Sequence, residues 1–114
     1  LREFLHVDDM ASACKFLMEA PREKLDSENS PSCSHINAGV DGDVSIRQIA
    51  ELIAKSVGFT GELQFDSSKP DGVFRKFMSS EKMARLGWHH QISLEKGLKE
   101  TVAWYRDNLD SLRE

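Results

Sequence analysis

Apolar residues recur at intervals of three and four along three stretches of the chain, a spacing that is typical of amphipathic helices. The first stretch follows Asp8 and Asp9, the second opens at Ser45, and the third opens after Ser93. Each stretch places its apolar side chains on one helical face, which we expect to pack into a core. The three faces comprise Val7, Met10, Ala11, Cys14, Leu17 and Met18; then Ile46, Ile49, Ala50, Ile53 and Val57; and finally Leu94, Leu98, Val102, Tyr105, Leu109 and Leu112.

The boundaries of these helices carry recognisable cap residues. Ser45 and Gln48 have the spacing of a capping box, in which each side chain bonds to the backbone of the other residue. Gly58 suits a left-handed C-terminal cap of the same helix. Pro21 is expected to end the first helix, and the polar residues 22–33 are then predicted to form a surface loop.

Two shorter features lie in the second half of the chain. Residues 66–73 are rich in turn formers and predict a loop. Residues 80–86 predict a short helix that Gly87 closes, after which Trp88 is expected to pack at the edge of the core.

Short apolar runs at residues 4–7, 35–38 and 63–65 are predicted to be strands. Because strands alternate with helices, the predicted fold class is α/β. A sheet of three short strands has marginal stability by itself. We therefore expect the first strand to belong to a sheet whose other strands lie elsewhere. The chain opens at Leu1 in mid-strand, and we therefore expect a fragment of one domain that is unstable or aggregates in isolation.

Composition and charge narrow the function classes. The chain is 39% hydrophobic and 30% charged, with a net charge of −4, which argues against nonspecific nucleic-acid binding. No apolar run approaches the length of a membrane span. Neither the cysteines nor the histidines show zinc spacing, so no metal site is expected. We expect Cys14 to be a buried thiol and Cys33 a surface thiol in a reducing cytosol.

The sequence shows neither the glycine-rich loop that binds a nucleotide cofactor nor the tyrosine–lysine pair that reacts with it. The nearest candidate for a glycine-rich phosphate loop, residues 39–42, has Ser45 where a third glycine is needed. Tyr105 is followed four residues later by Leu109 rather than lysine, and its place on an apolar face favours core packing. We therefore assign no cofactor-binding residue to this chain.

Two segments carry candidate binding residues. Arg2 stands at the start of the first predicted strand, where it either points into a cleft or lies on the surface. Asp8 and Asp9 are open to a paired-carboxylate role, but helix capping explains them better. The loop over residues 69–76 concentrates cations around a Pro-Asp-Gly turn, which suits phosphate binding or a solvated turn. Its candidates are Lys69, Asp71, Arg75 and Lys76.

Several blocks of the sequence together resemble the extended short-chain dehydrogenases/reductases. They are Arg2-Glu3-Phe4-Leu5-His6-Val7-Asp8-Asp9, His35-Ile36-Asn37-Ala38-Gly39, Leu86-Gly87-Trp88 and Ser93-Leu94-Glu95-Lys96-Gly97-Leu98. The combination of Ser34-His35-Ile36-Asn37 with Lys69-Pro70-Asp71-Gly72 and Arg75-Lys76 is most similar to the GDP-L-fucose synthase family. These enzymes epimerise GDP-4-keto-6-deoxy-mannose and reduce it with NADPH.

The resemblance implies an architecture and a division of roles. Residues 1–114 would be the small C-terminal GDP-sugar-binding domain, and a Rossmann domain before Leu1 would hold NADPH and the catalytic residues. Arg2 would contact the substrate diphosphate, while Asp71 and Lys76 would contact the nucleotide, with Arg75 matching the same motif. The whole enzyme would be a cytoplasmic homodimer, paired through the missing domain, and the fragment alone would be inactive.

Two other functions remain open at this stage. One is the same domain of a different nucleotide-sugar epimerase, dehydratase or reductase. The other is a module without catalysis that serves protein contacts only.

Overall fold

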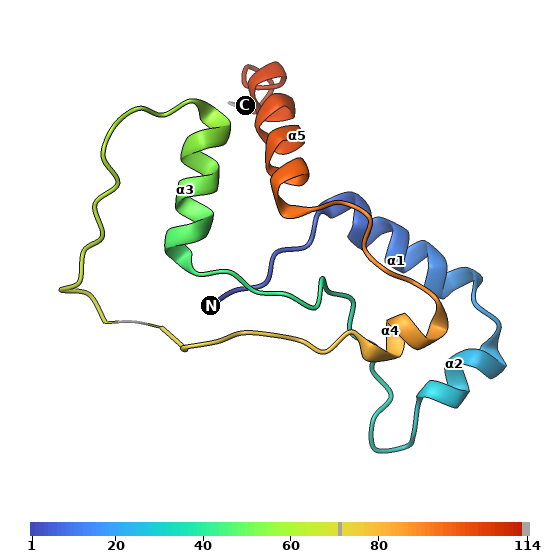
Figure 1. The fold of residues 1–114 in the computed structure, drawn as a ribbon. Coiled ribbons are helices and arrows are strands. Elements are labelled where there is room, and N and C mark those ends of the chain that lie inside the picture. The colour runs from blue at the N-terminus through green and yellow to red at the C-terminus, as the bar shows by residue number, and fades with distance from the viewer. Residues whose placement is uncertain (71, 113–114) are drawn as a thin grey trace.

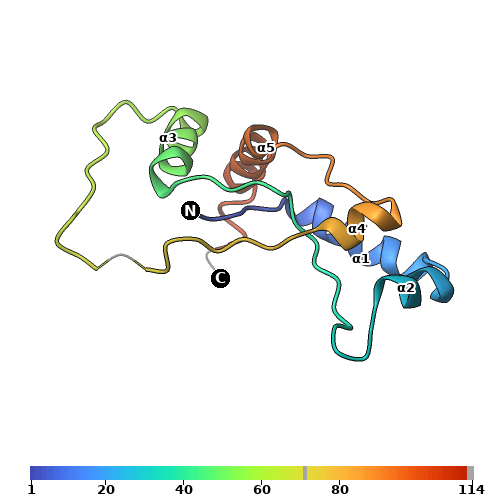
Figure 2. The same ribbon diagram turned by 60° about the horizontal axis from the view of Figure 1, so that its bottom comes forward.

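The computed structural model describes residues 1–70 and 72–112, and its regular elements are helices (Figure 1). The described elements are α1 (Val7–Glu19), α2 (Arg22–Glu28), α3 (Ile46–Val57), α4 (Glu81–Leu86) and α5 (Leu94–Asp107). Helices α3 and α5 pack together, as do α2 and α4. The described residues between α3 and α4 run outside the helices as long stretches without regular structure, as both views show (Figures 1 and 2).

The chain is open for its length. Its radius of gyration is 17.7 Å, whereas a compact domain of this length has about 13 Å. Its accessible surface is 8779 Å², against about 6,300 Å² for a compact monomer of this mass. Large apolar side chains remain at the surface, among them Met18, Phe74 and Trp104. The fold therefore leaves exposed much apolar surface that a compact domain would bury.

A small core joins α1 to α4 and to the turn that follows it. Ala13, Met83 and Trp88 form its buried centre, and the indole Nε1 of Trp88 donates to Ser12 Oγ at 3.0 Å. The predicted place of Trp88 and the helix that Gly87 closes are confirmed. Partly buried side chains pack around this centre: Leu5, Phe16, Leu17, Ile36 and Ala38.

The cap residues of α3 act as the sequence predicts. Ser45 and Gln48 form the reciprocal capping box, and Gly58 adopts a left-handed conformation with φ of 74°. In that region a residue with a side chain is strained, so glycine is favoured there. Arg106 of α5 donates to the carbonyl of Val57 at 2.7 Å and so ties α5 to the C-terminal end of α3.

The three predicted strands are not formed as regular strands in the described part of the chain. Residues 35–38 and 63–65 are extended or irregular, and Val7 is the first residue of α1. Pairing is limited to isolated bridges, such as those that Arg2 makes with Val44 and Lys76. A strand is stabilised by the neighbour that accepts and donates its backbone hydrogen bonds. The extended runs lack such neighbours within the described residues.

Most of the expected core-facing stripe of α1 faces outward instead, although Leu17 packs against the core as predicted. Val7, Met10, Cys14 and Met18 are exposed, because the helix turns Ala13 and its neighbours toward Trp88. The predicted burial of Cys14 is therefore wrong, and Cys33 is the more covered of the two free thiols.

Three expectations about the last helix and the segment after Pro21 also fail. Tyr105 is exposed rather than packed, and α5 ends at Asp107, before the predicted Leu109. The amide side chain of Asn108 bonds to the carbonyl of Trp104 and occupies an acceptor at the end of the helix. Residues 22–33 are not all loop, since α2 begins directly after Pro21, whose fixed φ suits a helix start.

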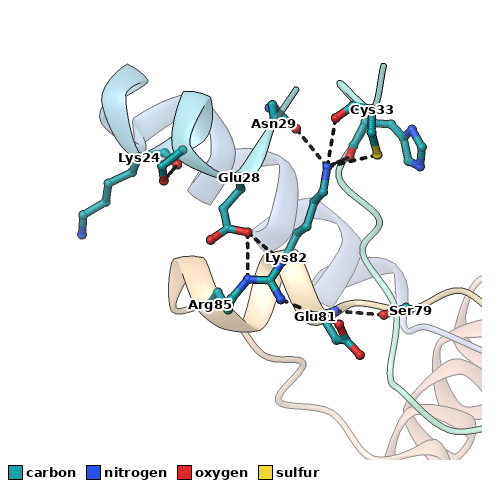
Figure 3. Close-up of polar contacts among 10 residues, drawn as sticks. Lys24, Glu28, Asn29, Cys33, Ser79, Glu81, Lys82 and Arg85 are labelled. Atoms are coloured by element: carbon teal, nitrogen blue, oxygen red, sulfur yellow. Dashed lines mark hydrogen bonds and ion pairs between the residues drawn. The ribbon is translucent and has the colours of Figure 1, made fainter. Parts of the chain in front are cut away.

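A polar cluster fastens α2 and the loop after it onto α4 (Figure 3). The ammonium group of Lys82 donates to Asn29 Oδ1 at 3.2 Å, to the Cys33 carbonyl at 3.1 Å and to the His35 carbonyl at 3.0 Å. Beside it, Arg85 pairs with Glu28 at 2.8 Å. These bonds, rather than a large apolar contact, hold the α2 region to the core.

Replacing Lys82 tests this point. In the full-length protein, Lys82→Met should lower the free energy of unfolding by about 1–3 kcal/mol, because charged hydrogen bonds to partly buried acceptors are lost. Thermal or denaturant unfolding measures the change. Lys24→Met is the matched control, since the Lys24 side chain extends away from the cluster in Figure 3. Equal stability of the two variants would contradict the role given to Lys82.

Candidate functional site

Three of the four predicted binding residues line one cleft. Arg2, Arg75 and Lys76 share a hollow of about 550 Å³. The fourth, Asp71, lies outside the described residues. The rest of the lining combines one carboxylate with mostly apolar groups: Glu3, Leu5, Met10, Ala38, Gly39, Phe77 and Met78.

Backbone pairing brings the first and last of these cations together. Arg2 exchanges two hydrogen bonds with Val44, each of 2.9 Å, in an antiparallel bridge. On its other side, the amide of Lys76 donates to the carbonyl of Leu1 at 3.2 Å, which forms a parallel bridge. Residues more than 70 positions apart in sequence thus become neighbours on adjacent segments.

The guanidinium of Arg2 is tied to the loop that follows Gly72. Its Nη1 donates to the carbonyl of Val73 at 2.8 Å and to that of Leu1 at 2.6 Å. Its Nη2 lies 3.4 Å from the point where a Cβ on Gly72 would stand. Because both bonds use Nη1, the other guanidinium N–H groups can serve an anion in the cleft.

Arg75 directs its charge elsewhere. Its Nε pairs with the carboxylate of Asp43, and its guanidinium carbon lies 4.4 Å from the centre of the Phe77 ring. An arginine that is both paired and stacked is held in one orientation. In this arrangement Arg75 shapes the cleft wall, while Arg2 and Lys76 are better placed to meet a ligand.

Glu3 is a cleft residue that the sequence did not single out. Its Oε1 accepts from the amides of Val40 at 2.7 Å and Asp41 at 3.2 Å, and its Oε2 accepts from Met78 at 3.3 Å. Asp41 has φ of 52°, and consecutive amides that converge through such a turn make an anion-binding concavity. A charged side chain next to Arg2 in a strand was the only signal available.

The same contacts bear on the candidate phosphate loop at residues 39–42. Its convergent amides already bind the Glu3 carboxylate, so they do not fit a cofactor pyrophosphate. The chain next enters α3 through the Ser45 capping box, rather than through a glycine turn.

The acidic pair in the first turn of α1, Asp8 and Asp9, does not cap the helix as predicted. The side chain of His6, not a carboxylate, caps the helix by accepting from the Asp8 amide at 3.2 Å. Asp9 is buried, and its two oxygens accept from the amides of Gln91 and Ile92 at 3.0 Å each. Asp8 is exposed. Asp9 therefore anchors the segment after Trp88, and the pair does not form a site with two facing carboxylates.

The described residues form neither a metal-binding cluster nor a membrane-spanning helix. Residues 1–70 and 72–112 contain no group of three or more His, Cys, Asp or Glu side chains that could hold a metal ion. Within the same ranges, every helix is too short or too polar to traverse a bilayer.

Comparison with known proteins adds sequence and fold relatives. No protein-family model matches the chain. GDP-L-fucose synthase of Escherichia coli is 48% identical over 113 residues, which are 99% of this chain and 35% of that protein. GDP-L-fucose synthase 1 of Arabidopsis thaliana is 46% identical over 109 residues, covering 96% of this chain and 31% of that protein.

Solved structures share the fold as well. A GDP-6-OMe-4-keto-L-xylo-heptose reductase from C. jejuni superposes with a TM-score of 0.85 at 36% identity, covering 94% of this chain and 31% of that one. The GDP-mannoheptose C4 reductase of Campylobacter jejuni with NADP bound gives a TM-score of 0.78 at 37% identity, covering 92% of this chain and 31% of that one.

Over nearly its whole length, the chain is therefore similar in fold to solved GDP-sugar reductases of the short-chain dehydrogenase/reductase type. Its sequence is similar over the same range to GDP-L-fucose synthases. It spans about a third of the length of the relatives that it matches.

The loop that leads to the cleft offers a test by titration. Ser68 donates to Asp66 Oδ1 through its hydroxyl at 2.6 Å and through its amide at 2.9 Å. The hydroxyl bond, followed by the amide bond, holds the pKa of Asp66 below its ordinary value. Ser68→Ala should raise the pKa of Asp66 partway back, as carboxyl chemical shifts followed against pH would show.

The sign of the linked stability follows from that direction. The bonds stabilise the loop above the ordinary carboxyl pKa, and the effect is lost as the pH falls through the lowered value. Ser67→Ala is the control, and an equal change of the Asp66 pKa in both variants would contradict the assignment.

Proposed function

We propose that the chain is the GDP-sugar-binding part of an NADPH-dependent epimerase/reductase that makes GDP-L-fucose from GDP-4-keto-6-deoxy-mannose. The observation that carries the proposal is the placing of Arg2 and Lys76 on neighbouring segments of one cleft. An arginine fork and a lysine point charge on one wall suit a diphosphate. The similarity to GDP-L-fucose synthases supplies the particular sugar.

In this proposal each residue of the cleft has a defined task. Arg2 contacts the diphosphate, and Lys76 contacts the nucleotide side of the substrate. Arg75, held by Asp43 and Phe77, keeps the wall in shape. Asp71 keeps its predicted contact with the nucleotide as part of the proposal.

The redox chemistry belongs to another part of the protein. The convergent amides of Val40 and Asp41 already bind the Glu3 carboxylate, which argues for NADPH being held outside this segment. Residues 1–114 would then form the C-terminal domain, and a Rossmann domain would carry the cofactor and the catalytic groups. NADPH, when bound there, supplies the hydride, while this chain binds and orients the sugar nucleotide. The segment alone would be inactive, and the whole protein would act as a homodimer in the cytoplasm.

A second candidate is the reductase of another GDP-bound sugar. The solved structures most similar to this chain include GDP-heptose reductases that match it with TM-scores of 0.78 and 0.85. Turnover of GDP-4-keto-6-deoxy-mannose and of a GDP-4-keto-heptose by the full-length protein separates the two. Faster turnover of the deoxy sugar supports the synthesis of GDP-L-fucose. Turnover of the heptose alone would replace that function with the reduction of a GDP-heptose.

Calorimetric titration of GDP into the full-length protein, with UDP as the competing nucleotide, tests the site itself. GDP should bind selectively, and Arg2→Ala and Lys76→Met should each weaken it by about 10- to 150-fold. This range corresponds to losing a charge-assisted bond worth about 1.5–3 kcal/mol.

Lys24→Met, on the exposed helix α2, removes the same charge far from the cleft and should leave GDP binding unchanged. Binding of neither nucleotide would contradict the cleft assignment, and a preference for UDP would contradict the GDP-sugar. Unchanged affinity in Lys76→Met would remove that residue from the site.

A further inference from the structure

We propose that Glu3 is a positioning residue, which holds the walls of the cleft at the separation that lets Arg2 and Lys76 meet one diphosphate. The inference rests on the proposed function and assigns a role to a residue of the same cleft. Glu3 is negatively charged and lies in a cleft that is proposed to bind an anionic diphosphate, so its presence there needs a physical reason.

The reason lies in what the carboxylate holds. One oxygen takes the amides of Val40 and Asp41, and the other takes the amide of Met78. These donors belong to two segments that are nearly 40 residues apart in sequence, and no regular strand pairing joins the two segments. Glu3 thus joins the turn at residues 39–41 to the segment that carries Lys76. Because Glu3 follows Arg2 directly, the same carboxylate fixes both cations relative to each other.

The surroundings are built around this carboxylate. A Cβ placed on Gly39 would stand 2.4 Å from Glu3 Oε1 and 3.0 Å from Glu3 Cδ. The absence of a side chain at Gly39 therefore makes room for Glu3. The turn is held from its far side too, since Asp41 Oδ1 accepts from the amide of Ser80 at 2.9 Å. The 39–41 turn is fastened on both sides.

An amide in place of the carboxylate cannot make the same set of bonds. Glutamine has one acceptor oxygen and one NH₂ group, so either the Met78 amide or the turn amides would face a donor. The negative charge of Glu3 is spread over three N–H groups, which limits its repulsion of a bound diphosphate. The geometry thus favours a carboxylate that orders the cleft rather than one that reacts.

The experiment is steady-state kinetics on the full-length protein and its Glu3→Gln variant. The KM for the GDP-sugar should rise about tenfold, as expected for losing one or two backbone bonds that order the site. The kcat and the KM for NADPH should stay within about twofold, because the reacting groups are untouched. GDP affinity by calorimetry should fall by a factor similar to the rise in KM.

Glu51→Gln removes the same charge from the exposed face of α3 and should change none of these values. If Glu3→Gln does not fold, Gly39→Ala replaces it, because the added Cβ would stand 2.4 Å from Glu3 Oε1 and 2.9 Å from Ser80 Oγ, so the Glu3 carboxylate has to shift. The same rise in KM for the GDP-sugar is expected, and an unchanged KM in this variant would overturn the inference.

The outcomes distinguish this inference from the function on which it rests. If the parent protein binds GDP and Glu3→Gln binds it equally well, Glu3 is not a positioning residue, while the proposed function stands. If kcat falls in the variant while the KM for the GDP-sugar is unchanged, the substitution has only lowered the fraction of folded protein, and the inference is overturned. If the parent protein itself binds no GDP, both proposals fall.

Discussion

The backbone of Arg2 joins three segments that are distant in sequence. Its amide and carbonyl pair with Val44, and the neighbouring carbonyl of Leu1 accepts from Lys76. These bonds form the two bridges that join the segments beside the cleft. The cleft, the placing of Arg2 beside Lys76 and the turn that Glu3 fills all depend on this junction, so the site is a product of backbone pairing more than of side-chain packing.

The rest of the chain is organised by local polar bonds around a small core. Lys82 and Arg85 fasten the α2 region, Asp9 fastens the segment after Trp88, and Arg106 fastens α5 to α3. Such bonds contribute little net stability each, because they replace bonds to water. The exposed stripe of α1 and the unpaired extended segments then present apolar and backbone groups that further protein surface would stabilise.

How far the sequence predicted this structure depends on the range of the interactions. Local signals succeeded: the Ser45 capping box, the Gly58 and Gly87 caps and the burial of Trp88 were all predicted. The strand expectations failed because a strand depends on a partner, which local sequence does not specify. The exposure of most of the α1 stripe was missed, because periodicity shows which residues share a helical face but not which neighbour that face meets. The grouping of Arg2 with Arg75 and Lys76 came from a family resemblance, and Glu3 was missed because its partners are backbone amides.

The measurement that tests the central claim most directly is a crystal structure of the full-length protein with GDP bound. The account predicts the diphosphate between Arg2 and Lys76, with the Glu3 carboxylate still bonded to the amides of Val40 and Met78. A GDP molecule bound elsewhere, with Arg2 and Lys76 facing solvent, would contradict it.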